Sequence, residues 1–111
     1  MTNSGSNPSP TQRAYLALGA NLGDAVATLQ QAIAVLQSSA DLQVTALSGF
    51  YRTAPYEAEG PDFCNAVIAV NTAMTPEALL AYCLAIEHQF GRVRSTRNAP
   101  RTLDIDLIAM G

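Results

Sequence analysis

The sequence predicts an α+β fold in which two helices cover one face of a four-stranded antiparallel sheet. Two observations lead to this fold class. Four short segments are rich in apolar and β-branched residues, which is typical of strands. Two longer segments repeat apolar residues at helical spacing behind capping residues, which is typical of amphipathic helices. In chain order the segments alternate as β-α-β-β-α-β.

The first half of this order is a strand, a helix and a second strand. Ala14–Leu18 is short and apolar and is followed by glycine, which indicates a buried strand. Asp24 can cap the helix that comes next. Its apolar positions at helical spacing are Val26, Leu29, Ile33 and Leu36. Leu42–Tyr51 is expected to be one continuous strand in which Gly49 marks a bulge.

The second half begins with a loop over residues 53–62, which hold two prolines and a glycine. Phe63–Thr72 is rich in β-formers and makes the third strand. Thr75, followed by proline, starts a helix that ends at Gly91. Its expected apolar positions are Leu79, Leu80, Leu84 and Ile86. Thr102–Ile108 completes the order, which is the split βαβ arrangement of ferredoxin-like folds.

Length and composition limit the possible functions. The 111 residues fit one domain, and we expect residues 1–13 to be a flexible tail before a domain of residues 14–111. A formal net charge of −3 argues against nucleic acid or an acidic membrane as the partner. Neither a secretory signal nor a membrane-spanning apolar run is seen, so a cytoplasmic location is expected. In that reducing compartment Cys64 and Cys83 are expected to be buried free thiols.

Two acidic residues on the last predicted strand are the strongest indication of chemistry. Asp104 and Asp106 are two residues apart, so both carboxylates point to one face while Ile105 points to the helices. Adjacent carboxylates repel unless a cation lies between them, and Mg²⁺ prefers such oxygen ligands together with water and phosphate. The alternative is a pair of solvated acids on an exposed face.

The basic residues are concentrated just before this strand. The chain has no lysine, and four of its six arginines fall within ten residues: Arg92, Arg94, Arg97 and Arg101. A guanidinium group can bind phosphate oxygens in pairs, so the cluster indicates one local anion. A solvated basic turn is the alternative. Acids and arginines together favour nucleotide phosphoryl chemistry, although no P-loop motif is present.

These residues resemble a known family. Gly91–Ile108 (GRVRSTRNAPRTLDIDLI) strongly resembles the signature of the hydroxymethyldihydropterin pyrophosphokinases. Three further stretches resemble the same family in the same order: ALGANLGD (Ala17–Asp24), FYRTAP (Phe50–Pro55) and PDFCNAV (Pro61–Val67). The resemblance extends from Ala14 to Gly111.

The resemblance implies an activity in folate synthesis. This family transfers the β,γ-pyrophosphoryl unit of ATP to the hydroxymethyl group of 6-hydroxymethyl-7,8-dihydropterin and releases AMP. By resemblance, Asp104 and Asp106 would bind two Mg²⁺ ions between ATP and the substrate hydroxyl. ATP contacts would come from a helical glutamate and the four arginines, namely Glu87, Arg92, Arg94, Arg97 and Arg101.

The same resemblance implies a pterin site. The pterin ring would lie against Phe63, because a flat heterocycle gains contact area by stacking on a ring. Asn65 would read its edge with one donor and one acceptor. Further contacts would come from the proline-bearing loop at Thr53, Pro55 and Tyr56. Without the resemblance, Phe63 would be assigned to the core and Asn65 to a strand-end cap.

The sequence also departs from the family. Its members usually continue well beyond the position of Gly111, so the domain is expected to lack its usual C-terminal part. This would expose apolar surface near Phe63 and favour self-association. Two hypotheses remain open. The chain is a Mg²⁺-dependent pyrophosphokinase, or it is a non-catalytic ferredoxin-like module that binds nucleotide or pterin, including an inactive fragment of such an enzyme.

Overall fold

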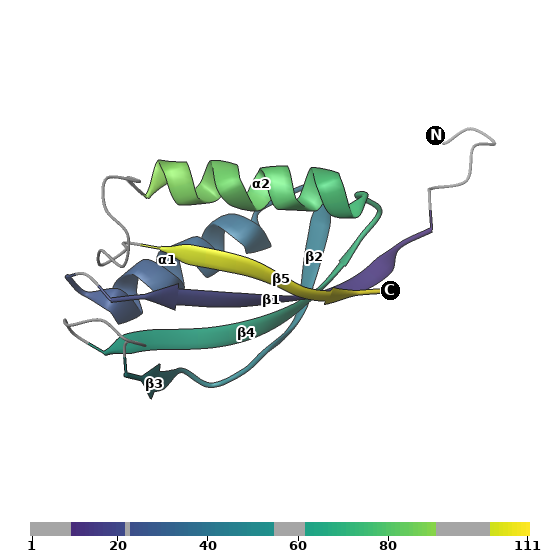
Figure 1. Cartoon of the computed structure of the whole chain (residues 1–111). Helices are drawn as coiled ribbons and strands as arrows, with labels where there is room; N and C mark the ends of the chain where they lie inside the picture. The colour runs from purple at the N-terminus through teal and green to yellow at the C-terminus, as the bar shows by residue number, and fades with distance from the viewer. Residues whose placement is uncertain (1–9, 22, 55–61, 91–102) are drawn as a thin grey trace.

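A computed structural model describes residues 10–21, 23–54, 62–90 and 103–111 (Figure 1). The order of its elements is β1 (Gln12–Ala20), α1 (Ala25–Gln37), β2 (Leu42–Leu47), β3 (Tyr51–Thr53), β4 (Phe63–Thr72), α2 (Pro76–Gln89) and β5 (Asp104–Met110). Gln12 pairs with Thr72, so the first strand already begins inside the segment that was expected to be tail.

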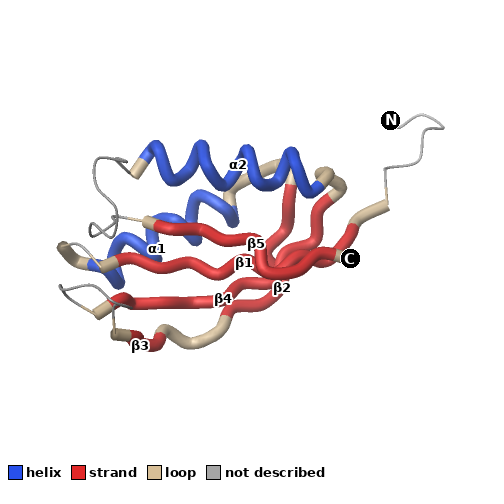
Figure 2. Tube along the Cα trace, in the orientation of Figure 1, coloured by secondary structure: helices blue, strands red, loops and turns tan. Residues whose placement is uncertain are grey.

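The strands form one antiparallel sheet in the order β2-β4-β1-β5, with β3 paired to β4. Both helices lie on the same side of this sheet (Figure 2). The α+β fold class and the ferredoxin-like order are therefore confirmed. The sheet has five strands rather than four.

The additional strand arises because the predicted second strand is divided. β2 ends at Leu47 and β3 begins at Tyr51. Between them, the Ser48 amide donates to the carbonyl of Val67 at 2.9 Å, and the Ser48 hydroxyl accepts from the Val67 amide at 2.8 Å. A side chain thus replaces one backbone partner, and regular pairing stops. The register shift lies between Val44 and Ala46, so the expected bulge at Gly49 was wrong.

Both predicted helix starts are confirmed. The Asp24 carboxylate accepts a hydrogen bond from the Ala27 amide at 3.1 Å. The Thr75 hydroxyl accepts from the Ala78 amide at 3.1 Å, with Pro76 at the first position of α2. These caps satisfy amides that have no partner inside the first turn.

The predicted buried faces of the helices were partly wrong. Val26, Leu80 and Leu84 are 40%, 45% and 44% exposed. On α2 the buried stripe instead contains Leu79, Cys83, Ile86 and Glu87. Leu80 and Leu84 each follow a stripe residue directly, and one residue turns the side chain by about 100° around a helix of 3.6 residues per turn. The stripe therefore excludes both leucines.

The core fills the space between the helices and the sheet. Alternate residues of β1, including Leu16 and Leu18, face the helices together with Ile68 of β4 and Ile105 of β5. Cys64 and Cys83 are buried free thiols, as expected. None of the described helices is long and apolar enough to cross a membrane. The residues between the core positions face the other side of the sheet.

Candidate active site

The candidate site lies on the outer face, which we define as the face of the sheet opposite α1 and α2. Gly19 of β1 pairs with Asn65 of β4 on one side and with Asp104 of β5 on the other. Tyr51 of β3 continues this row beyond Asn65. The adjacent row on the same face is formed by Val67, Ala17 and Asp106. Because paired residues of antiparallel strands point to one face, the sheet brings the predicted metal and pterin residues together.

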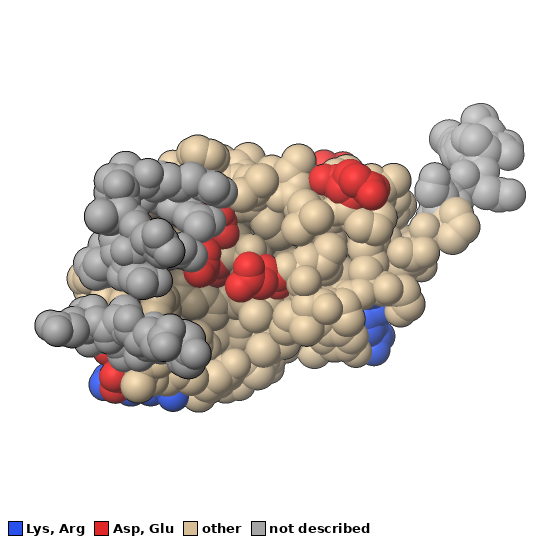
Figure 3. All heavy atoms as spheres, viewed as in Figure 1, with Lys and Arg blue, Asp and Glu red and all other residues tan. Residues whose placement is uncertain are grey.

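The two carboxylates of β5 lie as the sequence predicted. Asp104 is half-buried and Asp106 exposed, while Ile105 between them is buried on the helix side. Figure 3 shows acidic side chains gathered over β5. Two carboxylates on one strand face suit Mg²⁺, which takes one or two protein carboxylates and completes its shell with water and phosphate oxygens. Among the described residues, no three His, Cys, Asp or Glu side chains are grouped to hold a metal ion.

Asn65 is held in place from the β3 side. Its amide nitrogen donates to the hydroxyl of Thr53 at 2.9 Å and lies 3.3 Å from the carbonyl of Phe63 and 3.4 Å from that of Tyr51. Its amide oxygen points toward Gly19. The expected donor is thus already engaged within the protein, and the oxygen faces the middle of the outer face as an acceptor.

Gly19 leaves room between the two halves of the site. A Cβ atom at this position would lie 3.1 Å from the amide oxygen of Asn65 and 3.6 Å from the ring of Phe63. The first distance is shorter than ordinary van der Waals contact. The close approach of the Asn65 side chain therefore favours glycine at this position. Gly23, in the turn before α1, has a φ of 58°, which favours glycine for a different reason.

Phe63 is half-buried and lies outside the core cluster. It pairs with Thr53 at the end of the sheet, and its ring lies beside Gly19. The assignment of Phe63 to the core is therefore not borne out. A partly exposed ring next to an amide offers a stacking surface for a flat ligand.

Glu87 is the best-buried acidic residue of the described chain. Its side chain is 2% exposed, and its Oε2 accepts a hydrogen bond from the Ile105 amide at 2.6 Å. The family resemblance implied that Glu87 contacts ATP, and this role stays a prediction. Burial raises the pKa of the neighbouring Cys83 thiol to about 11, with smaller contributions from Glu87 and Asp106.

The remaining predicted site residues lie outside the described ranges. They are Pro55, Tyr56, Arg92, Arg94, Arg97 and Arg101. In sequence the arginines directly follow α2, which carries Glu87, and directly precede β5, which carries the two aspartates.

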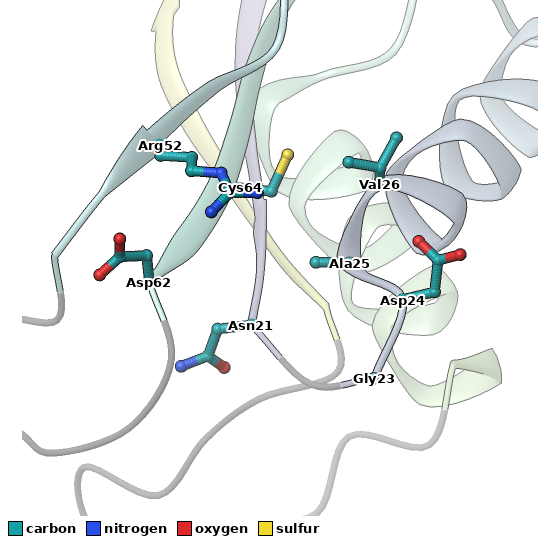
Figure 4. A pocket seen from close by; sticks show the side chains of 8 residues that line it. All are labelled: Asn21, Gly23, Asp24, Ala25, Val26, Arg52, Asp62 and Cys64. Carbon is teal, nitrogen blue, oxygen red and sulfur yellow. The ribbon is translucent and has the colours of Figure 1, made fainter.

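A pocket that the sequence did not indicate lies on the helix side of the sheet (Figure 4). It has a volume of about 350 Å³ and is lined by Asn21, Gly23, Asp24, Ala25, Val26, Arg52, Asp62 and Cys64. Figure 4 shows Arg52, Asp62 and Asn21 on one side of it and the start of α1 on the other. Asn21 is buried at this pocket, and its polar side chain directly after the apolar first strand is the sequence signal that could have indicated it. Since Cys64 alternates with Phe63 and Asn65, this pocket is separate from the outer-face site.

The fold and the site define an α+β domain of ferredoxin-like topology whose outer face combines paired carboxylates with an amide and an aromatic ring. The chain belongs to the 7,8-dihydro-6-hydroxymethylpterin-pyrophosphokinase (HPPK) family, whose model matches residues 15–111. This confirms the resemblance seen in the sequence.

Several relatives carry the name 2-amino-4-hydroxy-6-hydroxymethyldihydropteridine pyrophosphokinase. The protein of Methylorubrum extorquens is 46% identical over 98 residues, which cover 87% of this chain and 62% of that protein. The Synechocystis protein is 38% identical over 104 residues, which cover 94% of this chain and 53% of that protein. The Bacillus subtilis protein is 40% identical over 97 residues, which cover 86% of this chain and 58% of that protein. The chain thus spans between 53% and 62% of the length of these curated relatives.

A solved structure of a dinuclear metal-binding M20-family peptidase from Bacillus subtilis has a TM-score of 0.48 and 15% identity, and covers 93% of this chain and 28% of that one. This likeness is too weak to bear on fold or function.

Proposed function

We propose that this chain provides the metal-binding and pterin-binding surface for transfer of pyrophosphate from ATP to 6-hydroxymethyl-7,8-dihydropterin. The observation that carries the proposal is the row formed by Asn65, Gly19 and Asp104, which joins the two sets of residues across one sheet face. The family membership reported above supports the choice of reaction. Since ATP is the co-substrate, the proposal includes a cytoplasmic location.

In this proposal the pterin binds at the β3–β4 end of the row. Its ring stacks on Phe63, and the amide oxygen of Asn65, aimed toward Gly19, accepts a hydrogen bond from the ring edge. Thr53 fixes Asn65 through their 2.9 Å hydrogen bond. By the family resemblance, Pro55 and Tyr56 would also contact the pterin.

The polyphosphate binds at the β5 end. Asp104 and Asp106 would hold Mg²⁺, with two ions as the expected number. Bound Mg²⁺ would neutralise phosphate charge as it shifts during transfer. Arg92, Arg94, Arg97 and Arg101 would hold the remaining phosphate oxygens.

The chemistry is a displacement at the β-phosphorus of ATP. The hydroxymethyl oxygen of the pterin forms a bond to this phosphorus, and the bond to the oxygen that bridges the α- and β-phosphates breaks. AMP leaves with that oxygen, and the proton of the hydroxyl is released. The residues on the outer face contribute by holding the two substrates in line.

AMP formation from ATP and hydroxymethyldihydropterin tests the proposal directly. We expect Mg²⁺-dependent AMP release by this chain, and its loss in Asp104→Asn. Asp41→Asn, an exposed aspartate at the opposite end of the sheet, is the matched control and should retain activity. Pterin and nucleotide binding without AMP release would instead indicate the non-catalytic module.

Self-association is a separate part of the proposal. Tyr15, Tyr51 and Ile108 are large apolar side chains that are 40%, 48% and 56% exposed, which supports it. Sedimentation velocity over a range of concentrations tests this part, and a monomer at every concentration would contradict it.

A further inference from the structure

Glu87 connects α2 to the strand that carries both aspartates. It is nearly completely buried, and its Oε2 accepts a 2.6 Å hydrogen bond from the amide of Ile105, which lies between Asp104 and Asp106. A hydrogen bond of this length from an amide to a carboxylate belongs to the strong, charge-assisted kind. The bond spans 18 positions of sequence, so it fixes tertiary structure rather than a local turn.

The place of β5 in the sheet explains why this bond matters. β5 is an edge strand, with β1 as its only strand neighbour within the described sheet. The Ile105 amide donates to Glu87, which belongs to α2 and not to a strand of the sheet. An edge strand is otherwise held from one side alone, and the start of β5 would be free to twist there. Glu87 therefore holds the segment from its second side at the position where the carboxylates project.

We infer that Glu87 is a positioning residue, which holds the backbone of Ile105 so that the Asp104 and Asp106 carboxylates stay in register for a divalent cation. The inference rests on the proposed function, because it assumes that these aspartates bind the metal. It assigns Glu87 a structural role behind the strand, in place of the direct ATP contact that the sequence suggested.

Two variants separate the hydrogen bond from the charge. Glu87→Gln removes the charge but keeps an oxygen that can accept from Ile105, whereas Glu87→Ala removes both. Glu77→Ala, an exposed glutamate in the first turn of the same helix, is the matched control. The probe is Mn²⁺ alone, followed by electron paramagnetic resonance, so that neither ATP nor turnover enters the measurement.

We expect Glu87→Ala to weaken Mn²⁺ binding about tenfold, the lower range for loss of a residue that supports a metal ligand. Glu87→Gln should lose clearly less, and Glu77→Ala should match the wild type. Amide spectra report the bond itself. The Ile105 proton should resonate far downfield in the wild type, move upfield partly in Glu87→Gln and return to the ordinary strand range in Glu87→Ala.

Several results would overturn the inference. Equal Mn²⁺ affinity of wild type and Glu87→Ala would remove the positioning role, as would equal losses in Glu87→Gln and Glu87→Ala, which would assign the effect to charge. An Ile105 proton that is insensitive to Glu87 would remove the bond. A wild-type chain that binds no Mn²⁺ would instead contradict the proposed metal site itself, and the positioning role with it.

Discussion

The two halves of the outer face are held by different means. On β5, Asp104 and Asp106 project from a strand whose backbone is bound from behind by Glu87, a buried residue of α2. On β4, Asn65 is held within the sheet by the hydroxyl of Thr53, which belongs to a strand of only three residues. Gly19 lies between the halves and contributes no side chain.

This difference indicates which half is easier to disturb. β3 is short, and in the described part of the sheet it pairs with β4 alone; all its residues are exposed. The contacts of Asn65 are therefore open to competition from water and ligand. The bond to Ile105 is shielded by the core and should persist through local opening of the sheet edge. The pterin half should adapt to its ligand, and the metal half should be preformed.

The largest effect is expected at the metal half. Asp104→Ala and Asp106→Ala should each abolish Mg²⁺-dependent nucleotide binding while the circular dichroism spectrum stays unchanged. The physical reason is that neither carboxylate can be replaced by another on the same strand face. Calorimetry with ATP and Mg²⁺ measures this, and unchanged binding in Asp104→Ala would contradict the assignment of Asp104 as a metal ligand.

Gly19→Ala should act on the pterin half alone. The added methyl group would lie 3.1 Å from the Asn65 oxygen, so the amide must move off its preferred rotamer at a cost of about 1 kcal/mol. We expect pterin binding to weaken about fivefold, with nucleotide binding unchanged. Gly49→Ala is the control, because nothing lies within 4 Å of its Cβ position. Equal pterin affinity of Gly19→Ala and wild type would show that pterin binding does not depend on the space beside Gly19.

Thr53→Val tests the hydrogen bond by which the Thr53 hydroxyl holds the Asn65 side chain. The variant removes the 2.9 Å acceptor and leaves the amide nitrogen with the two longer contacts to carbonyl oxygens. We expect a loss of about 1 kcal/mol in the free energy of unfolding, together with weaker pterin binding. Thr53→Ser, which keeps the hydroxyl, should match the wild type in both stability and pterin affinity. Thr45→Val, which removes a hydroxyl bonded to the Ala69 carbonyl, should lower stability without affecting the pterin.

The smallest effect concerns Cys83, behind the metal half. Burial is the main cause that raises its pKa from 9.0 to about 11. The folded state therefore favours the neutral thiol, and this contribution is complete below pH 9 and is lost as the pH rises toward 11. Denaturation without metal should show stability falling over this window, by about 3 kcal/mol at most. Cys83→Ala should be less stable but should lack this part of the slope; an identical slope would contradict the assignment.

The sequence was sufficient for features that depend on local periodicity. Alternation along a strand correctly placed Ile105 toward the helices and the two aspartates on the opposite face. Capping chemistry correctly placed the starts of both helices at Asp24 and Thr75.

Features that depend on tertiary contacts were missed. The break after Leu47 reflects the bond between Ser48 and Val67, 19 residues apart, which no local pattern contains. The role of Glu87 likewise depends on how α2 packs on β5, and an acidic residue on a helix normally predicts solvent exposure. Leu80 and Leu84 were assigned to the core because they are apolar, while the packed stripe passes one position away.

The location of both ligands on the outer face is the central claim, and chemical-shift mapping of one labelled sample tests it most directly. Addition of the pterin should shift the amide signals of Phe63, Asn65 and Gly19. A non-hydrolysable ATP analogue with Mg²⁺ should then shift those of Asp104, Ile105 and Asp106, with Gly19 responding to both ligands. Shifts confined to the helix side, around Asn21, Ala25 and Val26, would contradict the account.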